Sequence, residues 1–167
     1  MTAPTPKNAL SKSLARLDKL PPALARTART LIMRNIVRFV GTAKLDIVEL
    51  TNTRCVVSVK NRPRVRNHIG SVHAAAIALI AETATGFVVG LNVPDDRAPV
   101  IKSMKVEYKK RAKGALRAEA TLTPEQIEQI VATEKGEVRV DVKVTDEGGV
   151  EPVQCEMIWA WTPKRRG

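Results

Sequence analysis

The chain has 167 residues, 44% hydrophobic and 27% charged, a balance that is typical of a soluble globular domain and argues against disorder or membrane embedding. A chain of this length fits one domain around one core. The net charge of +11 predicts an anionic partner, which nucleic acid, a phospholipid surface, coenzyme A phosphates or an acidic carrier protein would each satisfy. Because only 3% of residues are aromatic, too few for base-stacking platforms, we expect no specific nucleic-acid binding.

No apolar run approaches the roughly 20 residues that span a bilayer, and the N-terminus lacks the apolar core of a secretory signal. We therefore expect a cytoplasmic protein without a transmembrane segment. The basic, acid-poor first 40 residues also resemble a mitochondrial transit peptide in composition, and this alternative stays open. Cys55 and Cys155 fall on apolar faces and are expected to be buried free thiols. With two histidines and no zinc-ligand spacing, we expect no metal site.

The N-terminal part of the chain divides into two segments. Residues 1–22 contain several prolines and are predicted to form a flexible tail, followed by one domain over residues 23–167. Residues 23–40 predict an additional helix, which either packs on the domain with a solvated basic face or lies on a membrane surface. The expected packing side is apolar, and arginines lie largely off it; it consists of Leu24, Ala28, Leu31, Ile32, Ile36 and Val40.

After residue 41 the pattern changes to alternation, which predicts about six antiparallel strands. A capping box with proline at the first helical position predicts a short helix over residues 124–135, and the turn at residues 146–149 closes the last hairpin. The expected strands cover residues 42–50, 54–60, 100–109, 115–122, 137–145 and 150–161. The fold class is α+β, with this sheet wrapped around one apolar helix.

That apolar helix is predicted over residues 72–85, with Ser71 as N-cap and Gly86 as its end. Its body is apolar on all sides, as in a core helix, and Glu82 is its one carboxylate. Burying a carboxylate is costly, so Glu82 needs hydrogen-bond partners, a raised pKa or access to a wet cleft. These conditions suit a general base, although a carboxylate satisfied by arginine or backbone would also fit.

The start of the same helix offers unpaired backbone N–H groups and the positive end of the dipole, which could hold a developing oxyanion. Ala74 and Glu82 are eight residues apart, about 12 Å along a regular helix, so they cannot address one carbonyl within one chain. A two-fold dimer with antiparallel helices would bring Glu82 toward the partner's helix start. We therefore expect an enzyme of this design to be a homodimer or tetramer.

The spacing of Asn67, Gly70, His73-Ala74-Ala75 and Glu82 resembles the Asn, Gly, His-Gly-Gly and Asp/Glu signature of PaaI-like hotdog-fold thioesterases. The stretches 102–109 and 113–116 are similar to the strand and turn that follow the central helix there. The resemblance covers most of residues 42–161 and is closest to a subgroup of uncharacterised hotdog proteins.

The resemblance implies hydrolysis of an acyl-CoA or acyl-carrier thioester at a subunit interface, with no cofactor beyond the coenzyme A of the substrate. Glu82 would activate water or attack the carbonyl, and Asn67 would orient the carbonyl or water. The Ala74 N–H, aided by Ala75, would be the oxyanion donor, and His73 would shape the loop. Ala-Ala in place of Gly-Gly adds Cβ atoms where the substrate approaches.

The basic residues around this motif are candidates for binding coenzyme A phosphates through charge-assisted hydrogen bonds, although a solvated charge run is the simpler interpretation of each. They are Arg64, Arg66, Lys109, Lys110, Arg111 and Lys113. A non-catalytic hotdog module that binds acyl-CoA or lipid is the alternative function.

Overall fold

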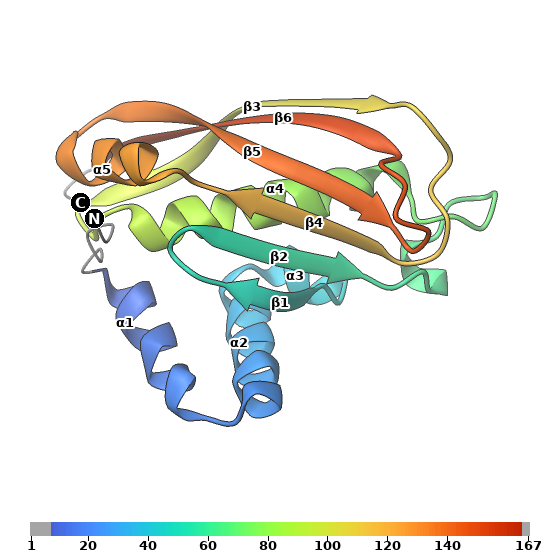
Figure 1. Cartoon of the computed structure of the whole chain (residues 1–167), viewed down its shortest axis with the longest axis horizontal. Helices are drawn as coiled ribbons and strands as arrows, with labels where there is room; N and C mark the ends of the chain where they lie inside the picture. The colour runs from blue at the N-terminus through green and yellow to red at the C-terminus, as the bar shows by residue number, and fades with distance from the viewer. Residues whose placement is uncertain (1–7, 165–167) are drawn as a thin grey trace.

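The computed structural model describes residues 8–164 and contains a six-stranded sheet that curves around a long helix (Figure 1). The strand order is β1-β2-β4-β5-β6-β3, and all neighbours are antiparallel. The prediction of an antiparallel sheet around one apolar helix is confirmed. The strands are β1 (Asp46–Leu50), β2 (Arg54–Val59), β3 (Arg97–Tyr108), β4 (Leu116–Thr121), β5 (Gly136–Asp146) and β6 (Val153–Pro163).

The enclosed helix is α4 (Ala74–Asn92), and most of its side chains are buried. One stripe is covered only in part by the rest of the chain: Ala78, Glu82, Gly86 and Gly90 are all half-buried. Residues four apart share one face of a helix. The predicted base therefore lies on the side of α4 that the subunit leaves partly open.

The predicted ends of this helix are wrong. The N-cap is His73 rather than Ser71, and its Nδ1 accepts a hydrogen bond of 3.0 Å from the Ala75 N–H. The helix also continues through Gly86, because this glycine serves packing rather than termination. A Cβ at position 86 would lie 2.6 Å from the Trp159 ring, so only glycine lets the indole approach this closely.

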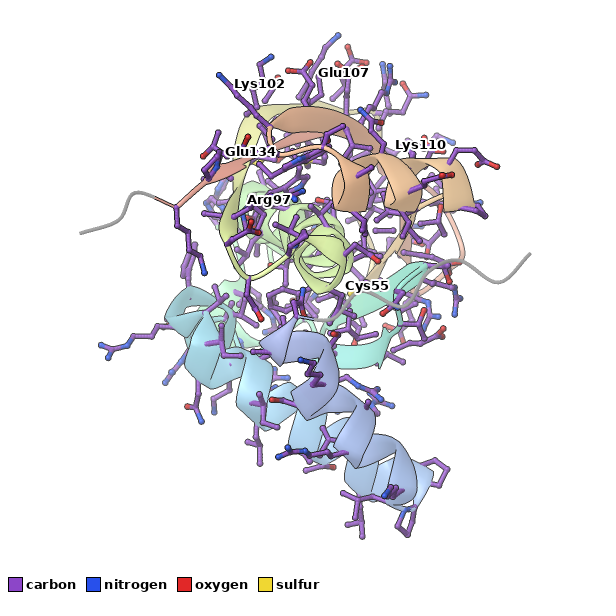
Figure 2. The ribbon with its side chains drawn as sticks, turned by 90° about the vertical axis from the view of Figure 1, so that its left-hand side faces the viewer. Cys55, Arg97, Lys102, Glu107, Lys110 and Glu134 are labelled. Carbon is purple, nitrogen blue, oxygen red and sulfur yellow. The ribbon has the colours of Figure 1, made fainter. Side chains whose placement is uncertain are left out.

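Among the described residues, α4 is the one helix long and apolar enough to cross a membrane by length and composition. However, 61% of its most apolar window is buried within the fold. Figure 2 views α4 nearly end-on and shows it enclosed between the sheet and the N-terminal helices. Its composition is therefore that of a core helix.

The N-terminal segment departs from the expected flexible tail. Residues 1–7 of that tail lie outside the described residues, but residues 8–19 form α1 (Ala9–Ala15) and the 3-10 turn η1 (Arg16–Lys19). The buried Asn8 side chain accepts a hydrogen bond of 2.7 Å from the Ser11 N–H and caps α1. Its Nδ2 donates to three carbonyls at the end of α4, those of Gly90 (2.8 Å), Leu91 (3.0 Å) and Val93 (2.8 Å). This double cap joins α1 to the core helix.

The predicted helix over residues 23–40 is divided at Val37 into α2 (Pro22–Ile36) and α3 (Arg38–Thr42). Its expected packing side is only partly right: Val40 is fully buried and Ile32 packs against the core, but Leu24 and Leu31 are 59% and 54% exposed. Both leucines are therefore on a solvent-facing side of α2, the helix that lies below β1 in Figure 1.

The buried residues of α2 include the apolar Ala25 and Met33, and polar groups link the helix to the edge strand β1. The Thr30 hydroxyl accepts a hydrogen bond of 3.0 Å from the Ile47 N–H, and Arg34 donates to the Leu45 carbonyl at 2.8 Å. An edge strand presents unpaired backbone groups that need partners. The helix therefore turns Thr30 and Arg34 inward to satisfy that edge, and leucines lie on the outer face.

Two local predictions hold at opposite ends of β5. The helix α5 (Pro124–Ala132) begins with the expected capping box between Thr123 and Gln126. The turn after β5 is held by Asp146, whose Oδ1 accepts hydrogen bonds of 3.0 Å from the N–H groups of Gly148 and Val150. Local polar signals of this kind need no distant partner, so they could be identified from the sequence.

Both cysteines are free thiols, as predicted. Cys55 is buried, and burial raises the pKa of its thiol far above the usual range. Cys155 is only half-buried, contrary to the expectation of full burial, and burial raises its pKa to about 11.

Candidate active site

Glu82 lies at an apolar cavity of about 220 Å³ between α4 and the N-terminal helices. Burial raises the pKa of its carboxyl above the ordinary range, partly opposed by a 3.5 Å hydrogen bond from the Thr83 hydroxyl. No cation among residues 8–164 contributes to this shift, so neutralisation by arginine does not apply. A carboxyl with a raised pKa in an apolar pocket has the properties of a general base. The other lining side chains include Leu10, Met33, Ile36, Phe87, Pro99 and Trp159.

A larger hollow of about 550 Å³ lies on the outer face of the sheet. Exposed or half-buried charged residues line it, among them Arg117, Glu119 and Arg139. Ligand sites are predominantly apolar with a few convergent polar groups. We therefore place the candidate site at the smaller cavity, which has that character.

The loop before α4 is shaped by Asn67 and Gly70. The Asn67 Oδ1 accepts hydrogen bonds from the Ile69 N–H (3.1 Å) and the Ser71 N–H (3.0 Å), and Gly70 has a φ of +78° that favours glycine. The Asn67 amide Nδ2 has no hydrogen-bond partner among the described residues. The loop thus uses the oxygen of Asn67 internally and leaves its donor available.

The helix start presents one N–H group rather than two. The expected second donor, the Ala75 N–H, is hydrogen bonded to His73 Nδ1, which corrects that part of the prediction. The exposed Ala74 has no hydrogen-bond partner for its N–H within residues 8–164. At the positive end of a 19-residue helix, this N–H is suited to hold a negative oxygen.

Tyr108 and Arg111 support this helix start, and the sequence had given neither this role. The Tyr108 hydroxyl donates to the Ala74 carbonyl at 2.8 Å. Arg111 donates from Nε to the Ser71 hydroxyl at 3.0 Å and from its guanidinium to the Ile69 carbonyl at 2.5 Å. Both residues lie more than 30 positions from their partners, so no local pattern could have revealed the contacts.

Glu82 and the Ala74 N–H belong to one regular helix and lie eight residues apart, about 12 Å along its axis. The structure therefore does not bring the predicted base and the predicted oxyanion donor together within one chain. It does leave the edge of β3 without a strand neighbour among the described residues.

The six basic candidates for phosphate binding differ in their surroundings. Arg66 donates to the Asn61 side chain at 2.9 Å, Lys109 pairs with Glu107 at 2.6 Å, and Arg111 is held in the loop as described. The exposed Arg64 and Lys110 side chains form no hydrogen bond or ion pair with any described residue, and the Lys113 side chain is also exposed. Figure 2 shows that Lys102 and Glu107 of β3 point away from the fold.

The histidines, cysteines and carboxylates of residues 8–164 form no group of three or more that could hold a metal ion.

The sheet order, the enclosed α4 and the loop that leads into it define a hotdog-fold protein. The family model described as "Domain of unknown function (DUF4442)" matches residues 26–161. The chain therefore belongs to the DUF4442 family, in agreement with the predicted likeness to an uncharacterised hotdog subgroup.

Several solved structures share this fold. A Pseudomonas aeruginosa protein of unknown function, named a probable thioesterase, is 26% identical, with 87% of this chain and 97% of that chain covered and a TM-score of 0.73. A thioesterase enzyme from Staphylococcus aureus, solved as a point variant, is 18% identical (76% and 100% covered, TM-score 0.65). A Haemophilus influenzae thioesterase is 12% identical (75% and 82% covered, TM-score 0.61). No curated protein matches the chain.

Proposed function

We propose that this protein is a thioesterase that hydrolyses an acyl-CoA or acyl-carrier thioester. The observation that carries the proposal is the Glu82 carboxyl, whose pKa is raised by burial at an apolar cavity. The names of the structural relatives, thioesterase or probable thioesterase, favour the same reaction class. Hydrolysis requires no cofactor beyond the coenzyme A or carrier portion of the substrate.

In the proposed reaction, the Glu82 carboxylate removes a proton from a water molecule as its oxygen attacks the thioester carbonyl. The Ala74 N–H stabilises the oxyanion, and the Asn67 amide donates to the carbonyl or the water. The tetrahedral intermediate collapses with cleavage of the C–S bond, and the thiolate takes up the proton. Thioester and water thereby yield carboxylic acid and thiol. Direct attack by Glu82 on the carbonyl would give the same products through an anhydride.

The reaction needs two copies of the chain, because Glu82 and Ala74 are too far apart within one. The edge strand β3 supports dimer formation, since it is 12 residues long and its free edge is not covered by another described strand. Its exposed side chains include Val100 (50%), Met104 (51%) and Tyr108 (50%). Pairing of β3 with a partner's β3 would bury this apolar surface, and Glu82 would act with the partner subunit's Ala74.

Coenzyme A phosphates would bind beside the helix start, where the basic candidates surround the loop. Arg64 and Lys110 are the strongest choices, because neither forms an ion pair within the described chain and both are exposed. Arg111 would act indirectly by holding Ser71 and the Ile69 carbonyl. We place the enzyme in the cytoplasm, a reducing compartment that keeps thiols such as Cys55 free.

The deciding experiment replaces Glu82 with Gln and measures thiol release from acyl-CoAs with short, long and aromatic acyl groups. We expect a fall in kcat of at least about 100-fold, the usual contribution of a general base. Glu134→Gln is the matched control, because Glu134 is exposed and is not one of the residues that line the cavity. Equal turnover by Glu82→Gln and wild type would contradict the proposal.

The alternative is a module that binds acyl-CoA or lipid without hydrolysis. One observation favours it: the Ala75 N–H is used by His73, so a single N–H remains for the oxyanion. Loss of one oxyanion donor costs roughly 100- to 1000-fold in kcat in other enzymes. Tight binding of acyl-CoA with no thiol release over the whole panel would establish this alternative.

A further inference from the structure

The cavity at Glu82 extends along α4 toward its C-terminal end. Gly90 also lines it, eight residues and about 12 Å beyond Glu82. The polar side chains among its lining residues, Glu82 and Thr83, are both at the end nearer the helix start. The remainder of the cavity therefore offers no hydrogen-bond partner from a side chain.

The outer wall is supplied by the N-terminal helices, through Leu10 of α1 and Met33 and Ile36 of α2. Leu10 lies at the Gly90 end, because Asn8, two residues earlier, donates its amide to the Gly90 carbonyl at 2.8 Å. The position of this wall is thus fixed by the double cap that joins α1 to α4.

Two glycines of α4 line the cavity, but they differ in the space that a Cβ atom would find at each position. A Cβ at Gly86 would meet the Trp159 ring, whereas a Cβ at Gly90 would have nothing within 4 Å. The space beside Gly90 is therefore free for a ligand, and a side chain introduced there would occupy it.

We infer that this cavity holds the acyl chain of the thioester, and that Leu10 and Gly90 set the chain length it accepts. The inference rests on the proposed function and adds a substrate class to it. A volume of about 220 Å³ equals roughly seven water molecules at about 30 Å³ each, and a methylene group is of similar size. The favoured acyl group is a saturated chain of roughly six to eight carbons, without a polar group at its far end, because a buried polar group would have no partner there.

The test compares Gly90→Leu, which fills the far end, with Leu10→Ala, which enlarges it. Values of kcat/KM are measured for saturated acyl-CoAs of two to sixteen carbons. Each buried methylene is worth about 0.8 kcal/mol, or a factor of about four. We expect Gly90→Leu to lower kcat/KM for octanoyl-CoA by roughly 50-fold, or about three methylenes, and to leave butyryl-CoA within twofold. Leu10→Ala should move the optimum toward longer chains.

Opposite shifts from two variants cannot arise from general loss of folding, and circular dichroism of each variant checks its fold directly. If the wild type hydrolyses acyl-CoAs and its chain-length profile is unchanged in Gly90→Leu and Leu10→Ala, the inference is overturned while the proposed function stands. If the wild type hydrolyses no thioester, the proposed function fails, and neutral n-alcohols of two to twelve carbons then test the cavity by calorimetry. Loss of 1-octanol binding in Gly90→Leu would support the chain site, whereas equal binding, or none by the wild type, would overturn it.

Discussion

The two glycines on the open stripe of α4 allow one substitution to be compared at two positions of the same helix. Replacing glycine by alanine in a helix interior stabilises it by about 0.5–1 kcal/mol, because the unfolded chain loses conformational freedom. Gly90→Ala should show this gain, since its Cβ meets no atom within 4 Å. Gly86→Ala should not, because its Cβ would lie 2.6 Å from the indole of Trp159.

The indole cannot easily move aside, because it is buried and its Nε1 donates to the Thr85 hydroxyl at 2.9 Å. Overpacking in a core costs about 1–3 kcal/mol, which exceeds the helix gain, so Gly86→Ala should be less stable than wild type by about 1 kcal/mol.

Urea denaturation at one fixed protein concentration measures both variants, since stability depends on concentration if the chain is dimeric. With a slope of about 2 kcal/mol/M, the two midpoints should differ by about 1 M. A midpoint for Gly86→Ala equal to or above that of Gly90→Ala would refute the packing role assigned to Gly86.

Three further predictions concern charge, capping and thiol exposure. Because the folded-state pKa of Glu82 is raised, the stability of the wild type should fall as pH rises from the ordinary carboxyl pKa of about 4.3 through the folded value. The urea midpoint of Glu82→Gln should therefore exceed that of the wild type at pH 8 but not at pH 4. A difference between the two midpoints that does not depend on pH would argue against burial of the charge. Asn8→Ala should lower the free energy of unfolding, measured by thermal unfolding, by about 2–3 kcal/mol, because α1 loses its N-cap and the α4 carbonyls lose their donor. Asn8→Asp keeps the cap acceptor but not the donors, so a melting temperature equal to that of the wild type would exclude the link to α4. In the native protein Cys155 should react with an aromatic disulfide reagent well before the buried Cys55, and equal rates of labelling would contradict the described burial.

The strands could be predicted from the sequence because alternation with a period of two is a local signal. In β5, for example, Val138, Val140 and Val144 are buried while Arg139 and Asp141 are exposed, which is the pattern that the sequence had indicated. The boundaries differ from the prediction by a few residues, as is usual where strands fray into turns.

The ends and faces of helices were harder to predict, because distant partners decide them. The sequence indicated that Gly86 ends the helix. In the structure its lack of a Cβ makes room for the ring of Trp159, which lies more than 70 residues later. Likewise, Leu24 and Leu31 suggested a packing face, but the side of α2 that faces the sheet carries Thr30 and Arg34. These two residues form hydrogen bonds with the backbone at and just before β1. Hydrophobic periodicity could not report the unpaired edge of a strand.

For the candidate site, the sequence motif indicated Glu82 and the loop before α4. The structure adds the cavity and its outer wall, which α1 and α2 supply. Asn8 and Leu10 were assigned to a flexible tail because their partners lie outside it. The carbonyls that Asn8 binds are more than 80 residues further along the chain, and Leu10 meets residues of α2 and α4 at the cavity. No pattern within residues 1–22 carries that information.

The double cap made by Asn8 also determines an order of events. Residue 8 leaves the ribosome before residues 90–93 have been synthesised, so α1 cannot acquire its anchor until the core helix has emerged. Docking of α1 therefore follows synthesis of the C-terminal end of α4. Detachment of α1 can correspondingly be a local opening, with a free energy below that of global unfolding. Hydrogen exchange at the backbone of residues 9–15 would report this opening while the amides of α4 stay protected. Through such an opening, the proposed acyl chain in the cavity could reach solvent without disturbance of the sheet.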